Sequence, residues 1–231
     1  MELRPLGSTG IHVSPLGLGT VKIGRNEQVK YPQGFEIPDD QTVSNLFALA
    51  SELGINFIDT APAYGTSEDR LGQLLPNRED WVIMTKVGEI FENGQSRFDF
   101  SASYTRQSIE SSLSKLKRDR VDIVLVHSDG NDMDIINNQG ALEELEKLKH
   151  QGLVGAYGMS TKTVEGGTWI VEHTDVVMAT YNLETSDELP IIQRAHELNK
   201  GVVVKKGLQS GHAVNVEDAF RHVLTQPGVS S

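Results

Sequence analysis

The sequence predicts an α/β fold of the (β/α)8 TIM-barrel type, with parallel strands inside and helices outside. Short β-rich runs recur along the 231 residues, and each is followed by a polar loop and a segment of helical periodicity. Gly54, Gly152 and Gly201 each stand between a helical segment and the next strand, where a left-handed helix cap is expected. Because a barrel of this type needs about 250 residues, we expect a single barrel domain over residues 1–231.

Seven runs have the composition of strands. They lie at residues 15–19, 55–58, 81–85, 122–126, 154–158, 176–179 and 201–204, and the first is the weakest. Between them, four segments carry apolar stripes at helical spacing, at residues 41–52, 104–116, 141–149 and 187–199. In the first of these segments Val43, Leu46, Phe47 and Ala50 fall on one face. This regular alternation favours one barrel over separate domains.

The two ends of the chain depart from this alternation. Residues 3–6 and 11–14 flank Gly-Ser-Thr-Gly at positions 7–10, which predicts a β-hairpin that plugs the N-terminal end of the barrel. Residues 226–231 look like the approach to an eighth strand, so we expect the eighth strand and the C-terminal tail to be missing from this chain. Residues 22–38 are expected to form a loop on the face that carries the chemistry.

Charge and composition exclude several classes of function. The 21 basic and 32 acidic side chains give a net charge of −11, which would repel nucleic acid and anionic membranes at long range. Without cysteine there is no thiolate nucleophile, disulfide or cysteine-bound zinc. No His-x-His pair suggests a hydrolytic metal site, and no metal is expected. The start of the chain has no signal-peptide core and no apolar run is long enough to span a membrane, so we expect a cytoplasmic protein.

Polar side chains follow four consecutive predicted strands. Asp59, Lys86, His127 and Ser160 are the first polar residues after the second to fifth runs, and Tyr64 lies in the loop after Asp59. Because the carboxyl ends of parallel strands meet at one rim of a barrel, these side chains are expected to lie close together.

Their chemistry indicates a proton-transfer site. Lys86 at the mouth of an apolar interior needs a counter-ion, which Asp59 can supply. A phenol near the ammonium has its pKa lowered, which would make Tyr64 a usable proton donor, and His127 could orient a substrate oxygen. Each residue alone also has a structural interpretation, as a helix cap, a salt bridge, a loop aromatic or a packed histidine. Their combination on neighbouring strands favours a site.

Four stretches carry a resemblance to a known family. They are LRPLGSTGIHVSPLGLGT near the start, FIDTAPAYGTSEDRLG at residues 57–72, VIMTK ending at Lys86, and SSLSKLKRDRVDIVLVH ending at His127. Together they resemble the aldo-keto reductases. The resemblance implies a catalytic tetrad of Asp59, Tyr64, Lys86 and His127, in which Tyr64 is the general acid, Lys86 tunes its pKa and Asp59 pairs with Lys86. It also implies NADPH, with NADH as an alternative, and direct hydride transfer to a small-molecule aldehyde or ketone.

The same resemblance implies the positions that contact the cofactor. They are Gly19, Thr20, Asp59, Ser160, Thr161, Met178, Lys205, Lys206, Leu208 and Ser210. Three of them depart from the family pattern: Thr161 stands where asparagine is usual, Met178 where glutamine is common, and Lys205 where many members place a stacking tyrosine. Lys205 and Lys206 could instead neutralise phosphate groups or form a solvated charged pair.

Two other functions are compatible with parts of the sequence. The run from Gly17 to Lys22 begins like the dinucleotide motif G-x-G-x-x-G, but Lys22 occupies the place of the third glycine. A cofactor-sensing or regulatory protein that keeps the reductase fold is the stronger alternative, since the cofactor positions are altered. The reductase hypothesis and the regulatory hypothesis differ in whether NADPH is consumed when an aldehyde is supplied. No feature predicts the oligomeric state.

Overall fold

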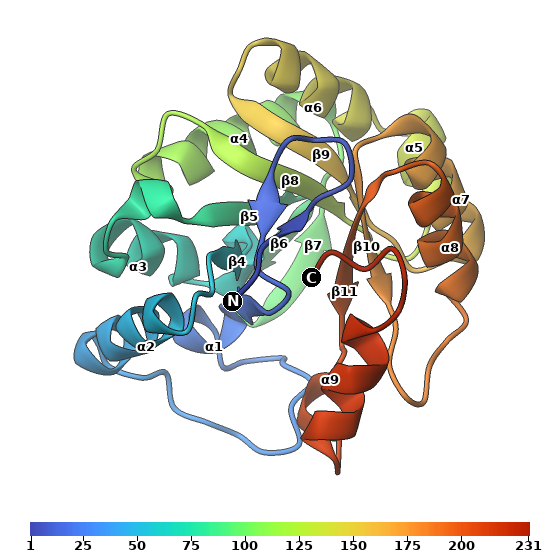
Figure 1. Cartoon of the computed structure of the whole chain (residues 1–231). Helices are drawn as coiled ribbons and strands as arrows, with labels where there is room; N and C mark the ends of the chain where they lie inside the picture. Colours follow the sequence, from blue (N-terminus) through green and yellow to red (C-terminus); the bar gives the residue numbers. More distant parts are fainter.

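The computed structural model describes residues 1–231, and its centre is a parallel sheet of seven strands in the order β11-β10-β9-β8-β5-β4-β3. The strands are β3 Gly17–Gly19, β4 Phe57–Asp59, β5 Val82–Val87, β8 Val121–His127, β9 Val154–Ser160, β10 Val176–Thr180 and β11 Gly201–Lys205. Each corresponds to one of the seven predicted runs, so the predicted barrel-type sheet is confirmed. The sheet curls on itself and helices surround it (Figure 1).

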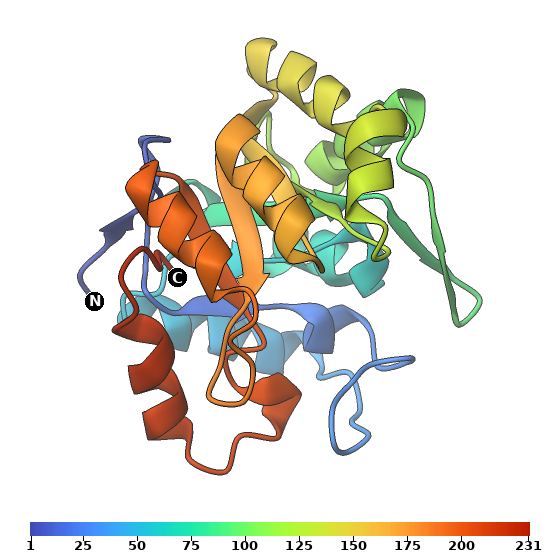
Figure 2. The same ribbon diagram turned by 90° about the vertical axis from the view of Figure 1, so that its right-hand side faces the viewer.

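The helices pack outside this sheet (Figures 1 and 2). They are α1 Val21–Gly24, α2 Asp40–Glu52, α3 Ser67–Leu74, α4 Ala102–Leu116, α5 Asp132–Asn138, α6 Ala141–His150, α7 Val164–His173, α8 Leu189–Glu197 and α9 Val216–Leu224. The four predicted helices correspond to α2, α4, α6 and α8. Asp39 caps α2 by accepting from the Thr42 N–H, and Ser101 caps α4 by accepting from the Tyr104 N–H.

The strands separate two hydrophobic cores. The larger core lies between the sheet and the helices, and the smaller one fills the inside of the curled sheet. Because successive residues of a strand face opposite sides, Ile123 and Leu125 of β8 enter the inner core, whereas Val124 and Val126 pack on the outer one.

The predicted N-terminal hairpin is present and closes one end of the sheet. Its strands β1 (Arg4–Pro5) and β2 (His12–Val13) pair in antiparallel fashion. Leu6 and Val13 are fully buried in the inner core. At Gly7, with a φ of +55°, an added Cβ would lie 2.4 Å from the Gly201 nitrogen at the first residue of β11. The hairpin therefore covers the N-terminal ends of the strands, opposite the rim where they end.

The seam between β11 and β3 is where an eighth strand would stand. These two strands do not pair. Instead, the Val204 N–H donates to the Ser231 carbonyl at 2.7 Å, and the Ser230 N–H donates to Val202 at 3.0 Å. The Ser231 hydroxyl donates to the Pro15 carbonyl at 3.3 Å. Ser230 and Ser231 thus lie along β11 in the gap between the two edge strands, and the sheet formed by residues 1–231 has seven strands.

The segment after β5 contains a hairpin that the sequence does not predict. Strands β6 (Glu89–Glu92) and β7 (Gln95–Phe98) pair in antiparallel fashion and project from the body of the molecule (Figure 2). Gly88, with a φ of +104°, makes the turn out of β5 against the Phe100 ring.

None of the helices is long and apolar enough to cross a membrane.

Candidate active site

Lys86 is the centre of the predicted site. Its side chain is 2% exposed and forms an ion pair with Asp59 at the end of the neighbouring strand β4. Its ammonium also donates to the Thr60 carbonyl at 3.0 Å and to the Tyr64 hydroxyl at 3.2 Å. The structure therefore brings the predicted aspartate, tyrosine and lysine into direct contact.

A buried set of hydroxyl groups holds the loop that carries Tyr64. The Thr20 hydroxyl donates to the Asp59 carbonyl at 2.9 Å, and the Ser67 hydroxyl donates to Thr20 at 2.8 Å. Ser67 and Thr60 lie 3.0 Å apart through their hydroxyl oxygens. Because all three hydroxyls are buried and satisfied, they tie the ends of β3 and β4 to the start of α3. This fixes the short turn Pro62–Tyr64 at the rim.

The electrostatics of the pair differ in part from the prediction. Burial of Lys86 opposes its charge, but Asp59 and Tyr64 outweigh burial and raise the pKa of the ammonium above its ordinary value. Burial raises the pKa of the Tyr64 phenol, and the Lys86 charge lowers it by less. The prediction of a lowered Tyr64 pKa is therefore wrong for the protein without ligands, although Lys86 acts in the expected direction.

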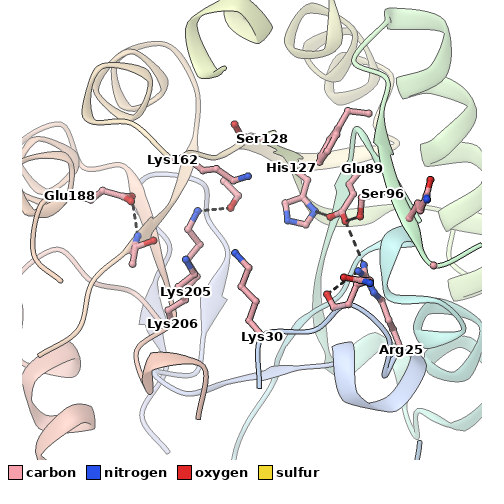
Figure 3. Close-up of a pocket in the computed structure, with 16 residues that line it drawn as sticks. Arg25, Lys30, Glu89, Ser96, His127, Ser128, Lys162, Glu188, Lys205 and Lys206 are labelled. Carbon is pink, nitrogen blue, oxygen red and sulfur yellow. Dashed lines mark hydrogen bonds and ion pairs between the residues drawn. The ribbon is translucent and has the colours of Figure 1, made fainter. Parts of the chain in front are cut away.

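His127 lies at the end of β8 beside Tyr64. The two rings meet edge to face with their centroids 6.5 Å apart. Nδ1 of the imidazole is 2.8 Å from Glu89 Oε2, a close polar contact that becomes an ion pair only when the ring is protonated. The opposite edge of the ring faces the cavity (Figure 3). Burial lowers the pKa of His127, and the Glu89 carboxylate counteracts this only in part.

Glu89 is a polar residue of the site that sequence reasoning missed. Its Oε1 atom accepts from the Ser96 hydroxyl at 2.6 Å and from Arg25 Nη1 at 3.4 Å. Burial would raise its pKa, but His127, Ser96 and Arg25 together lower the pKa to about 2. The available signal was its position three residues after Lys86, just past the same strand end.

The predicted residues meet in one cavity of about 380 Å³. All four tetrad residues line it. So do eight of the ten predicted cofactor positions: Gly19, Thr20, Asp59, Ser160, Met178, Lys205, Lys206 and Ser210. Leu208 lines an adjoining cavity at the β3–β11 seam. Thr161 is fully buried, and its hydroxyl lies toward Gly167 of α7. Unlike the other predicted cofactor positions, its side chain therefore does not line a cavity at the rim.

Lys205 crosses the cavity from the end of β11 to the end of β9. Its ammonium donates to the Ser160 hydroxyl at 3.0 Å and to the Thr161 carbonyl at 2.5 Å. Burial lowers the pKa of Lys205 to about 8, and the neighbouring Lys206 and Lys162 charges act in the same direction. No group of three or more histidine, aspartate or glutamate side chains is placed to hold a metal ion.

Known proteins are similar to this chain in sequence and in fold. A model of the aldo/keto reductase family matches residues 15–222. L-Galactose dehydrogenase of Arabidopsis thaliana is 32% identical over 225 residues, which are 91% of this chain and 66% of that protein. The NADH-specific methylglyoxal reductase of Escherichia coli is 30% identical over 199 residues, 79% of this chain and 60% of that protein.

A solved structure extends the likeness to almost the whole chain. A protein from Pseudomonas aeruginosa assigned to the aldo-keto reductases has a TM-score of 0.90 and 52% identity, covering 99% of this chain and 87% of that one. The chain spans about half to two thirds of the length of curated relatives that it matches. With a family model covering residues 15–222, a shared fold and matching motifs, the chain belongs to the aldo-keto reductase family.

Proposed function

We propose that the protein reduces aldehydes or ketones to alcohols with NADPH or NADH, and that Tyr64 is the proton donor. The observation that carries this proposal is the contact of the Lys86 ammonium with the Tyr64 hydroxyl at 3.2 Å, while Asp59 holds the same ammonium in its charged form. A salt bridge between Lys86 and Asp59 that served only stability would not require the Tyr64 hydroxyl beside the same ammonium.

The residues of the site divide the chemistry between them. The reduced nicotinamide, when bound, supplies the hydride that adds to the carbonyl carbon. The Tyr64 hydroxyl gives its proton to the carbonyl oxygen, and the Lys86 ammonium stabilises the phenolate that remains. Asp59 keeps Lys86 protonated throughout. His127, whose free edge faces the cavity, holds the carbonyl oxygen beside Tyr64.

The cavity fits a nicotinamide group at the rim. An added Cβ at Gly19 would meet no atom within 4 Å, so the end of β3 faces open space. Ser160 offers a hydroxyl for the carboxamide, and Lys205 and Lys206 offer charges for phosphate oxygens. NADH use is supported by the E. coli relative, whose name specifies NADH.

A first experiment follows the absorbance of reduced nicotinamide with 4-nitrobenzaldehyde, for NADPH and NADH separately. We expect turnover with the wild-type chain. Tyr64→Phe should reduce kcat by about a hundredfold or more, because it removes the proton donor with little change in volume, and should leave cofactor binding intact. Unchanged turnover in Tyr64→Phe would overturn the proposed role.

One observation favours a second function, cofactor sensing without turnover. The Lys205 ammonium donates to the Ser160 hydroxyl, so a carboxamide would have to share this hydroxyl with it, and Lys205 stands where many members of the family have a stacking tyrosine. In this case calorimetry would detect NADPH binding, whereas no aldehyde would consume it.

A further inference from the structure

A large cavity adjoins the candidate active site and is lined almost entirely by polar and charged residues. It has a volume of about 940 Å³, and Phe98 is its only hydrophobic lining residue. Five cationic side chains line it: Arg25, Lys30, Lys162, Lys205 and Lys206. Figure 3 shows Lys30, Lys162 and Lys205 turned toward a common space, with His127 on its other side.

The carboxylates of this cavity form no ion pairs with its lysines. Glu89 is held by His127, Ser96 and Arg25. Glu188 accepts a hydrogen bond from the Thr180 N–H at 2.9 Å. The ion pairs made by lysines elsewhere in the protein are those of Lys86, Lys147 and Lys149, so none of the lysines of the cavity has a carboxylate partner.

This clustering is unusual for the protein as a whole. The net charge is −11, yet five cationic side chains and only two carboxylates line one concave surface. A cavity lined by one sign of charge attracts ligands of the opposite sign and raises their local concentration.

The cluster extends beyond the residues proposed to hold the cofactor. The cavity that contains Gly19, Thr20 and Ser210 shares His127, Lys30, Lys205 and Lys206 with the larger one. Lys162, in contrast, lines only the larger cavity, as do Ser128 and the tip of the β6–β7 hairpin. If His127 holds the carbonyl group of a substrate, the rest of that substrate therefore lies in the larger cavity, among the lysines.

We propose that the substrate is a small, polar carbonyl compound that carries a carboxylate or a phosphate, and that Lys162 and Lys30 bind this anionic group. The proposal rests on the proposed reductase activity, because it assigns a substrate class to the same site. It also implies that bulky apolar aldehydes are poorer substrates, since Phe98 is the only hydrophobic side chain that lines this cavity.

The test compares two aldehydes of similar size, 4-carboxybenzaldehyde and 4-nitrobenzaldehyde, with the wild-type protein. We expect kcat/KM to favour the carboxylate by about tenfold, and the preference to shrink as ionic strength rises from about 0.01 M to about 1 M. Lys162→Gln and Lys30→Gln should each reduce the preference through KM for the carboxylated aldehyde. Lys147→Gln, which removes an exposed lysine of α6 that pairs with Glu144, is the matched control and should keep the preference.

The outcomes separate this inference from the proposed function. Equal or better use of the neutral aldehyde overturns the inference and leaves the reductase activity standing. If neither aldehyde is reduced, the proposed function fails, and calorimetry with 4-carboxybenzyl alcohol and 4-nitrobenzyl alcohol then decides whether the cavity selects anions. A raised KM for NADPH in Lys162→Gln, with unchanged aldehyde selectivity, would assign the lysines to cofactor phosphates and overturn the inference.

Discussion

Glu89 Oε2 lies 2.8 Å from Nδ1 of His127, and this contact joins the hairpin after β5 to the end of β8. A carboxylate beside one ring nitrogen of an imidazole favours a proton on that nitrogen and fixes the orientation of the ring. Because Ser96 and Arg25 hold the other carboxylate oxygen, Glu89 itself is fixed in place. The free edge of His127 is thereby presented to the cavity.

Glu89→Gln is expected to weaken the orientation of His127. We predict a fall in kcat/KM of about tenfold, and a shift of any His127-dependent limb of the pH–rate profile to lower pH. The direction follows because burial already lowers the pKa of His127 and the Glu89 carboxylate opposes that effect. Glu92→Gln on the same hairpin is the control, because Glu92 is exposed and pairs only with Arg97. An unshifted profile in Glu89→Gln would contradict the positioning role.

The same carboxylate makes the fold sensitive to acid. The pKa of Glu89 is about 2 in the folded protein against an ordinary value of 4.5, so the folded state binds its proton more weakly than the unfolded state does. The resulting stabilisation is complete above about pH 4.5 and is lost as pH falls toward 2. The shift corresponds to a free energy on the order of 3 kcal/mol. Urea unfolding at pH 3 and pH 6 should show a smaller difference in Glu89→Gln than in the wild type.

Lys86→Met should affect both turnover and stability. The buried ammonium is bound by Asp59, Thr60 and Tyr64, and its removal leaves the Asp59 carboxylate without its cation. We expect kcat to fall by about a hundredfold or more. The free energy of unfolding should fall by about 1 to 3 kcal/mol, less than for a fully buried pair because Asp59 is 23% exposed. The double variant Asp59→Asn/Lys86→Met should regain stability but not turnover, and full recovery of turnover would contradict the tyrosine mechanism.

Lys205 makes anion binding in the lysine-lined cavity dependent on pH. Its pKa of about 8 means that the folded protein loses this charge as pH rises from about 7 to 9. KM for 4-carboxybenzaldehyde should therefore rise over this range, whereas KM for 4-nitrobenzaldehyde should stay constant. Between pH 8 and 10.5 the unfolded state binds more protons at this site than the folded state, so this group makes folding stability rise with pH. Lys205→Arg should abolish the rise in KM, since a guanidinium remains charged.

The sequence predicts the sheet well because its strands are buried on both faces. Runs such as Val121–His127 are apolar on the inner and the outer side, so they stand out against the polar loops. The polar residues that close these runs then identify the rim. The β6–β7 hairpin escapes prediction because it is polar and largely exposed, and its pairing has no apolar pattern.

Long-range contacts account for the other differences. Glu89 acts on His127, a residue 38 positions later, and only the pairing of β5 with β8 brings them together. The pKa of Tyr64 depends on how deeply the phenol is buried, which no local pattern reports. The direction in which Thr161 points depends on the packing of α7 against β9.

The packing of α3 against α4 supplies a test of the fold. A Cβ at Gly72 would lie 1.9 Å from the carbonyl oxygen of Lys115, a backbone atom that cannot turn away. Gly72→Ala should therefore force the two helices apart and lower the free energy of unfolding by about 1 to 3 kcal/mol. The helix propensity of alanine, better than that of glycine by about 1 kcal/mol, offsets only part of this loss. Gly34→Ala, where a Cβ meets no atom within 4 Å, should leave urea unfolding nearly unchanged. A stabilised Gly72→Ala protein would show that the helices lie farther apart than described.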